Sequence, residues 1–270
     1  MLYLAKIRKP IQLDKEQILD FCQNTFSWGD YIDEVWDSWY NNEGLVIIEE
    51  NEKAIGMAHG VIYQNEKMLW LEGIRVNESY RKNGVATCLI AHFEKKAKDS
   101  NIIRINMLIE SENTSSLSLV KKLGYQIISK WNYFSLECKK NDFVETKFDT
   151  ISFNDLEDLK NMRFVESWRW VPITETNFSE LNSNSNILCI KRNGVIHSLG
   201  VISESNSFHD TMILTIIFGN DDDIHKMILH TQNISSAKNY SKIRILTEKE
   251  SLAISNIGNK FPFYLVEKIL

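Results

Sequence analysis

The sequence predicts an α/β fold, with mixed α+β sheets, in two similar halves. Apolar runs with strand spacing alternate with helical stripes along the first half. A similar order of elements returns in the second half, where Ile243–Ile245 echoes Ile103–Ile105 about 140 residues later. The length of 270 residues suits two small domains as well as one large domain. We therefore expect two copies of one fold, over residues 1–140 and 141–270.

The first half should begin with two helices and a hairpin. Asp14 and Gln17 have the spacing of a capping box ahead of an apolar helical stripe. A second helical stretch runs from about residue 31 to residue 40. The apolar runs 45–49 and 54–63 are joined by four polar residues, which predicts an antiparallel hairpin. The remaining elements of this half are a strand, a helix, a strand, a helix and two closing strands, over residues 67–76, 86–97, 102–109, 113–122, 126–131 and 133–138.

The second half repeats much of this order. Residues 151–165 carry a helical stripe, and the strands 187–191 and 195–203 flank an Asn-Gly turn typical of a hairpin. A further strand is expected over 212–218. The chain ends near the equivalent of Trp131, so we expect this copy to lack its last strand.

Composition excludes several classes of protein. Hydrophobic residues make up 43% and charged residues 25%, which excludes collagen-like, low-complexity and largely disordered chains. The formal net charge of −5 provides no basic field for nucleic acid. No apolar run is long enough to span a membrane, and the N-terminus lacks the features of a signal peptide. The four cysteines lie far apart with no C-x-x-C pair, which favours reduced thiols, no metal site and a cytoplasmic location.

A basic turn between a strand and a helix is the most informative feature. Arg81, Lys82, Asn83 and Gly84 follow the strand 67–76, and the next helix begins at once. A helix N-terminus exposes unpaired N–H groups and partial positive charge, so it binds phosphate. Gly84 would let the backbone approach such an anion closely. The alternative is a glycine-containing turn whose basic residues are solvated and bind no ligand.

This turn resembles the signature of the GCN5-related N-acetyltransferase (GNAT) superfamily, (Gln/Arg)-x-x-Gly-x-(Gly/Ala). A second family feature follows the next strand, as Asn113 and then Leu123-Gly124-Tyr125. The resemblance covers about residues 1–138, and the second half shares only the architecture. It implies two tandem acyl-CoA N-acyltransferase folds, with acetyl-CoA as cosubstrate and no metal.

The resemblance also implies which residues hold the cosubstrate. The pyrophosphate would meet the basic turn, the pantetheine arm would pair with the end of the preceding strand, and the thiol end would meet the later helix. Such pairing needs an unpaired strand edge, which the family supplies by splaying two parallel strands. The expected residues are Ile74, Arg75, Val76, Arg81, Lys82, Asn83, Gly84, Val85, Ala86, Thr87, Asn113, Ser115 and Ser116.

Acetyl transfer needs a group that takes a proton from the amine. Glu72 is the first candidate for this general base, because it lies in a largely apolar run that leads into the basic turn. The alternative is that Glu72 pairs with a nearby arginine or caps a bulge. Family bases also occur at the position of Trp70, and Glu110 is the reserve candidate. The tyrosine that the family uses as general acid is replaced here by Val120.

The acceptor side is expected in the first helices and their loop, which are rich in aromatic and acidic residues. Trp28, Gly29, Asp30 and Tyr31 are the candidates, because aromatic faces and carboxylates suit a cationic amine. The alternative is an amphipathic helix with its aromatic residues in the core. Trp168 is a further candidate from the second half, with interdomain packing as its alternative.

His59 lies on an expected strand, and a structural histidine is the simpler interpretation there.

The second half lacks the basic turn. Gly219 and Asn220 are followed by Asp221–Asp223, and three adjacent carboxylates would repel a pyrophosphate. We therefore expect this copy to bind no CoA. A calcium site is the weaker alternative, because the loop does not match an EF-hand.

These observations predict an N-acetyltransferase that transfers acetyl from acetyl-CoA to a primary amine in a ternary complex. A small-molecule acceptor is preferred, because a fused second copy tends to close a groove. A protein N-terminus or lysine is the alternative acceptor. The rival function is a non-catalytic acetyl-CoA-binding sensor or interaction module. Neither nucleic acid nor a membrane is expected as a partner, and the protein is expected to be a monomer or homodimer.

Overall fold

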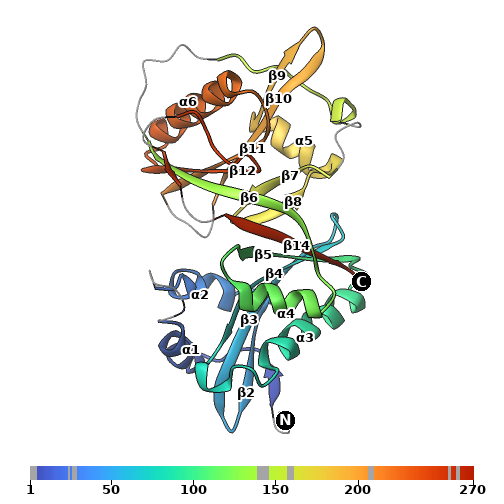
Figure 1. The fold of residues 1–270 in the computed structure, drawn as a ribbon, viewed down its shortest axis with the longest axis vertical. Coiled ribbons are helices and arrows are strands. Elements are labelled where there is room, and N and C mark those ends of the chain that lie inside the picture. The colour runs from blue at the N-terminus through green and yellow to red at the C-terminus, as the bar shows by residue number, and fades with distance from the viewer. Residues whose placement is uncertain are drawn as a thin grey trace. The chain divides into compact units, whose positions relative to one another are not determined.

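The computed structural model has the mixed α/β character that the sequence predicts (Figure 1). It describes residues 5–23, 25, 29–138, 146–156, 161–205, 210–254, 257–259 and 262–270. Contacts divide the chain into two compact units. The first comprises Met1–Leu108, Thr114–Ile127 and Val266–Leu270, and the second comprises Ile109–Asn113 and Ile128–Leu265. Most of residues 1–127 thus lie in the first unit, and most of residues 128–265 lie in the second.

The first unit has a sheet with the strand order β1-β2-β3-β4-β5-β14. Neighbours are antiparallel from β1 to β4, and β4 and β5 are parallel. Its elements before β14 are β1 (Lys6–Arg8), α1 (Asp14–Cys22), α2 (Ile32–Tyr40), β2 (Leu45–Glu50), β3 (Lys53–Tyr63), β4 (Met68–Val76), the 3-10 turn η1 (Glu78–Tyr80), α3 (Val85–Asp99), β5 (Arg104–Glu110) and α4 (Thr114–Lys122).

Helices cover both faces of β3. On one face, α1 and α2 bury Ile18 and Trp36 in a cluster with Met57. On the other face, the ring of Phe93 from α3 lies so close to Gly60 that any Cβ there would overlap it. The glycine is therefore required by this close approach rather than by a turn.

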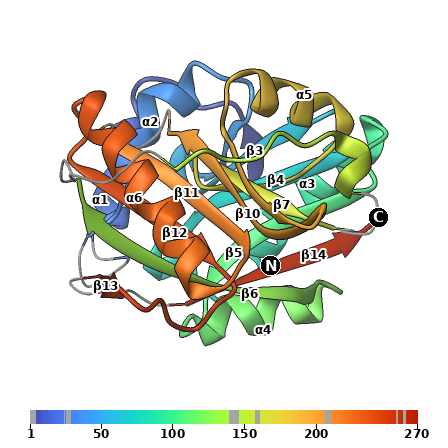
Figure 2. The same ribbon diagram turned by 90° about the horizontal axis from the view of Figure 1, so that it is seen from above.

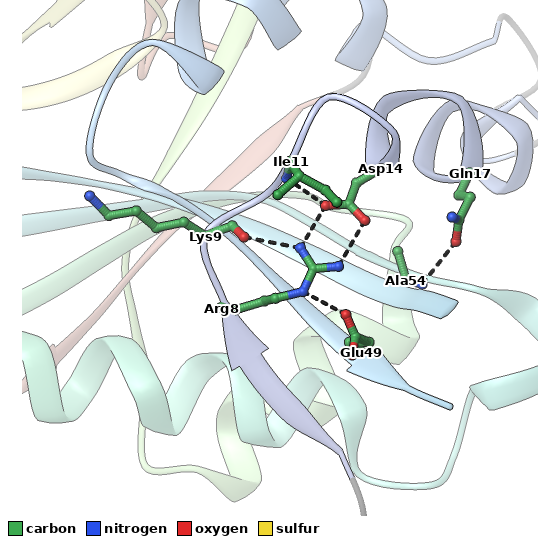
Figure 3. A network of polar contacts seen from close by, with 7 residues as sticks. All are labelled: Arg8, Lys9, Ile11, Asp14, Gln17, Glu49 and Ala54. Atoms are coloured by element: carbon green, nitrogen blue, oxygen red, sulfur yellow. Dashed lines mark hydrogen bonds and ion pairs between the residues drawn. The ribbon is translucent and has the colours of Figure 1, made fainter. Parts of the chain in front are cut away.

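The start of α1 corrects the expected capping box (Figure 3). Asp14 is the first helical residue, and no side chain caps this end of the helix. Its carboxylate instead accepts hydrogen bonds from the Ile11 N–H and from Arg8, at 2.6 Å and 2.7 Å. Arg8 also donates to Glu49 on β2, and Gln17 accepts from the Ala54 N–H at 3.0 Å. Both predicted capping residues are thus used to fasten α1 to the sheet.

The second unit has the strand order β14-β6-β12-β11-β10-β9, with β13 beside β6 and a separate hairpin β7-β8. Its helix α6 lies across β10, β11 and β12 (Figure 2), where Met227 joins a core cluster with Leu214 and Ile245. Its elements are β6 (Gln126–Glu137), η2 (Phe153–Leu156), β7 (Arg163–Glu166), β8 (Arg169–Pro172), α5 (Glu175–Ser183), β9 (Ile187–Arg192), β10 (Val195–Glu204), β11 (Thr211–Phe218), α6 (Asp221–Ala237), β12 (Lys242–Thr247), β13 (Gly258–Asn259) and β14 (Phe263–Ile269).

The expected repeat is visible in the order of elements. The succession β2-β3-β4-α3-β5 in the first unit matches β9-β10-β11-α6-β12 in the second. In each unit the strand before the helix pairs in parallel with the strand after it. Two parallel strands need a crossover connection, which is usually an α-helix and is right-handed. This explains why each copy carries its helix between two parallel strands.

Two strands depart from the expected path. The closing strands expected at 126–131 and 133–138 are one continuous strand, β6, which pairs with β12 from Asn132 to Glu137. The second unit thus obtains its missing strand from the first half of the sequence. Conversely, the C-terminal residues Val266–Leu270, which include the end of β14, lie in the first unit, where the Leu270 N–H donates to the Ile103 carbonyl at 3.0 Å.

The helix expected over 151–165 is wrong in the described residues. Only η2 is helical there, and β7 already begins at Arg163, while residues 157–160 lie outside the description. The segment is a strand because Phe164 and Val165 are buried and the Val165 N–H donates to the Thr215 hydroxyl at 2.9 Å. Tertiary contacts with β11 override the local helical pattern.

Candidate functional site

The basic turn and the start of α3 form an exposed anion-binding geometry. All four residues from Arg81 to Gly84 are exposed, and Val85 anchors the helix in the core. Gly84 is the N-cap residue with φ +86°, in the left-handed region that favours glycine. No side chain caps this end and no acidic residue lies in the first turn. The free N–H groups and the two adjacent cations therefore fit a pyrophosphate.

Strands β4 and β5 separate just beside this turn. Their parallel ladder has three residue pairs, from Met68 opposite Arg104 to Trp70 opposite Asn106. The described residues give no further pair between these strands, although β4 continues to Val76 and β5 to Glu110. The residues expected to pair with pantetheine, Ile74–Val76, lie on this diverging part of β4. The separation supplies the strand edge that an extended ligand needs.

A β-bulge accompanies the separation. Met57 on β3 pairs with Arg75 and His59 pairs with Glu72, so one residue of β3 opposes two of β4. Gly73 lies in the bulge with φ +63°, and a Cβ there would overlap the indole of Trp39. Glycine is thus required both by the backbone conformation and by the close approach of α2. The bulge redirects β4 immediately after Glu72.

Glu72 is held by two hydrogen-bonding partners. The Trp70 Nε1–H donates to Glu72 Oε2 at 3.0 Å, and His59 Nδ1 lies 2.8 Å from Glu72 Oε1. The Glu72 side chain is 14% exposed and that of His59 is 2% exposed. Trp39 stacks on the imidazole, with ring centroids 4.3 Å apart and planes 6° from parallel. A carboxylate with one side still accessible can accept a proton from a ligand.

A buried ion pair lies on the same strand. Arg75 donates to both carboxylate oxygens of Asp30, at 2.6 Å and 2.9 Å. Its guanidinium also lies 5.3 Å from the ring centre of Tyr31. Burial raises the pKa of the Tyr31 phenol, so this group stays protonated at neutral pH. Asp30 and Tyr31, expected to meet an acceptor, are therefore fastened to β4 through Arg75.

The remaining residues predicted for the first unit occupy the expected elements. Ala86 and Thr87 lie in the first turn of α3, and Ser115 and Ser116 lie at the start of α4. Val120, which replaces the expected tyrosine, is buried on α4. Gly29 is described with φ +101°, but Trp28 lies outside the described residues.

Glu110 and Asn113 belong to the segment Ile109–Asn113, which clusters with the second unit. The Asn113 N–H donates to the Glu110 carbonyl at 3.0 Å. Burial raises the pKa of the Glu110 carboxyl, and the nearby Glu112 charge raises it further. A raised pKa suits a proton acceptor, so Glu110 stays the reserve candidate for the general base.

Trp168 lies in the two-residue turn between β7 and β8. Both turn residues, Ser167 and Trp168, have positive φ, at 47° and 68°. The indole makes an edge contact with Tyr133 at 5.4 Å between ring centroids, and the Arg244 guanidinium lies 5.5 Å from its ring centre. The expected acceptor residue is therefore part of an aromatic cluster within the second unit.

The second unit closes the corresponding helix terminus with its own side chains. Asn220 caps α6 by accepting from the Asp223 N–H, and Asp223 is fully buried. The Asp223 carboxylate accepts hydrogen bonds from Arg192 and Ser198, both at 2.7 Å. In addition, β11 and β12 remain paired over six residues, from Thr211 to Ile216. Among the described residues of this unit, α6 has a capped N-terminus and β11 and β12 stay paired, unlike their counterparts in the first unit.

Three residues beside Glu72 have no functional role in the sequence interpretation. His59 was expected to be structural, and neither Trp39 nor Gly73 was expected at the site. The alternation along β3 places His59 on the face of Met57, but only the sheet register pairs it with Glu72. Gly73, directly after the predicted base, was the one local signal for a bulge.

A search of the described residues for metal clusters and membrane spans gave none. No group of three or more potential metal-ligating side chains occurs within the described ranges. No helix in the described part of the chain is long and apolar enough to cross a membrane.

Comparisons with known proteins bear on the family and the fold of the chain. The family model "Acetyltransferase (GNAT) family" matches residues 15–125, so this part of the chain is similar to a GNAT acetyltransferase domain. No curated protein matched the chain.

Solved structures match over nearly the whole chain. A putative acetyltransferase from Thermoplasma acidophilum is 12% identical with a TM-score of 0.63, covering 99% of this chain and 100% of that one. A GCN5-related N-acetyltransferase from Sphaerobacter thermophilus is 14% identical with a TM-score of 0.64, covering 98% and 95%. A putative acetyltransferase from Pyrococcus horikoshii is 11% identical with a TM-score of 0.58, covering 100% and 91%. At these identities the likeness establishes the fold, which extends over both units.

Proposed function

We propose that the first unit binds acetyl-CoA and transfers its acetyl group to a primary amine of a small molecule. The observation that carries this proposal is that three features occur together in one unit. An uncapped helix N-terminus with two cations, a separated pair of parallel strands and a held carboxylate lie on consecutive parts of residues 68–87. Each matches one requirement of the reaction, namely an anion site, a strand edge and a proton acceptor.

In the proposed reaction, the residues of this chain bind, orient and accept a proton. The backbone of Ile74–Val76 orients the pantetheine arm, and Arg81–Thr87 hold the pyrophosphate, while Asn113, Ser115 and Ser116 are assigned to the thiol end. Glu72 accepts a proton as the amine nitrogen forms its bond to the acetyl carbon and the carbon–sulfur bond breaks. Val120 offers no proton to the leaving thiolate, which solvent can protonate instead.

For the second unit we propose a supporting role without CoA binding. The Asp223 carboxylate and its hydrogen-bond partners already occupy the N-terminus of α6. This carboxylate would repel a pyrophosphate. Trp168 stays a proposed acceptor residue, because an aromatic side chain suits a cationic amine. A cytoplasmic monomer or homodimer remains part of the proposal.

A non-catalytic acetyl-CoA sensor is the second candidate function, and the replacement of the usual tyrosine by Val120 favours it. Release of free thiol from acetyl-CoA, measured across a panel of small amines and peptides, separates the candidates. Amine-dependent thiol release supports the enzyme, and preference for peptides would replace the small-molecule acceptor. Binding of acetyl-CoA without turnover on any amine would favour the sensor. Absence of binding would overturn both.

A further inference from the structure

We propose that His59 is a positioning residue that holds Glu72 as an ionised, oriented carboxylate. This inference rests on the proposed role of Glu72 as proton acceptor. It assigns a function to the buried histidine that the sequence interpretation treated as structural.

Each oxygen of the Glu72 carboxylate faces a nitrogen of a neighbouring side chain. Trp70 can only donate through Nε1–H, and it does so to Glu72 Oε2. His59 Nδ1 faces Oε1 at 2.8 Å, which is the length of a hydrogen bond to a charged group. Donation from Nδ1–H leaves both oxygens with lone pairs for an incoming amine. The opposite arrangement, with Glu72 protonated and donating to Nδ1, would leave no base.

The imidazole is fixed on several sides. Trp39 covers one face in a parallel stack at 4.3 Å. The ring edge at Nε2 faces Gly44, where an added Cβ would lie 2.7 Å from that nitrogen. Gly44 also approaches β3 closely, since the Gly60 N–H donates to its carbonyl at 3.0 Å. These contacts lock the rotamer of His59, which in turn fixes the carboxylate of Glu72 against the bulge at Gly73.

Other charged and titratable groups act on the same cluster. The Glu72 charge contributes to raising the pKa of Tyr31, so the phenol lies within its electrostatic reach. Arg75 opposes that effect, and its own charge is matched by Asp30. Cys22 also feels Asp30 and Arg75, but its pKa is raised to about 12, chiefly by burial. His59 Nδ1 lies within hydrogen-bonding distance of the carboxylate, to which Trp70 also donates.

Two substitutions separate positioning from simple packing. His59→Leu removes the donor at similar volume, and His59→Asn retains an N–H near the position of Nδ1. We expect His59→Leu to lower kcat about 10- to 100-fold. The acid limb of the pH profile should move to higher pH, because a carboxylate that has lost a donor holds its proton more tightly. His59→Asn should recover much of both, with acetyl-CoA affinity unchanged in each variant. Equal losses in the two variants, with an unshifted profile, would reduce His59 to a packing role.

A spectroscopic measurement tests the inference independently of the acceptor. Long-range ¹H–¹⁵N correlation spectra of the histidine ring in the full chain report the tautomer and its titration. We expect the Nδ1–H tautomer at neutral pH, with a changed titration in Glu72→Gln. The Nε2–H tautomer would overturn the proposal, since Nδ1 would then accept a proton from Glu72. If the expected tautomer is found but no amine is acetylated, the proposed function is wrong. The hydrogen bond from His59 to Glu72 would then be established without a catalytic role.

Discussion

Ser198 donates its hydroxyl hydrogen to Asp223 Oδ2 at 2.7 Å, and both side chains are fully buried. This bond joins β10 to the first turn of α6. It occupies, in the second unit, the helix terminus whose counterpart in the first unit is open. The same topological position is thus closed internally in one copy and available to a ligand in the other.

The Asp223 network predicts a specific dependence of stability on pH. Burial alone would raise the pKa of Asp223, but hydrogen bonds from Arg192, Ser198 and Asn220 outweigh it and lower the pKa. A carboxylate with a lowered folded pKa stabilises the fold above its unfolded pKa, and this contribution is lost as pH falls through the folded value. Asp223→Asn should therefore cost about 1–3 kcal/mol at neutral pH in urea unfolding. The difference from wild type should shrink below about pH 4.

Asp222→Asn is the matched control for this change, because Asp222 lies in the same turn but is exposed. We expect it to change the free energy of unfolding by less than about 0.5 kcal/mol. A similar cost for both substitutions would mean that the buried network contributes no more than the general charge of the turn.

A second prediction concerns the turn at Gly84. Gly84→Val should abolish the thermal stabilisation by acetyl-CoA, because a side chain at φ +86° distorts the backbone that approaches the anion. Gly194→Val is the control. Gly194 has a φ of +80°, and for both glycines an added Cβ meets open space. Both variants should lose about 1–2 kcal/mol from backbone strain, but only the first should lose the ligand response. Persistent stabilisation in Gly84→Val would contradict the placement of the cosubstrate.

A third prediction separates the two candidate bases. Glu72→Gln should lower kcat by at least about 100-fold while leaving acetyl-CoA binding intact, because it removes the proton acceptor and little volume. Glu110→Gln should have a smaller effect on kcat. The comparison requires steady-state kinetics with one amine that the wild type acetylates, over a range of pH. If the larger loss occurs in Glu110→Gln, the reserve candidate becomes the base.

A fourth prediction tests the exchanged strand β14. Val266 is 1% exposed and Ile269 is 63% exposed, on the same strand. Val266→Ala should lower the free energy of unfolding by about 2 kcal/mol, since it leaves a cavity in the core. Ile269→Ala should change it by less than about 0.5 kcal/mol. Because Val266–Leu270 lies in the first unit, Val266→Ala should also weaken stabilisation by acetyl-CoA. An unaltered response would show that β14 does not support the site.

Much of the first unit could be predicted because its signals are local. The basic turn Arg81–Gly84 is recognisable from consecutive residues, since a helix start and a glycine need no distant partner to act as an anion site. The apolar residues over 54–63 and 67–76 likewise predicted β3 and β4, which are buried over much of their length. The candidate base Glu72 was found in the same way, from its place in an apolar strand.

The errors occurred where distant residues decide local structure. Asp14 has the spacing of a capping residue, but the charge of Arg8 and the Ile11 N–H capture its carboxylate. Val165 lies in a helical pattern, but Thr215 and β11 draw it into a strand. In both cases a tertiary contact contributes more than the local preference it overrides.

The sequence by itself determined the repeated α/β architecture, the position of the anion turn and the identity of the candidate carboxylate. These depend on short-range periodicity and on the chemistry of neighbouring residues. Only the tertiary structure decided that His59 meets Glu72, that Gly73 forms a bulge under Trp39, and that β6 and β14 change places between the units. Strand register and strand order depend on hydrogen bonds between residues far apart in the chain. A one-residue slip of β3 hardly changes the match to the sequence pattern, yet it would move His59 to the other face of the sheet and away from Glu72.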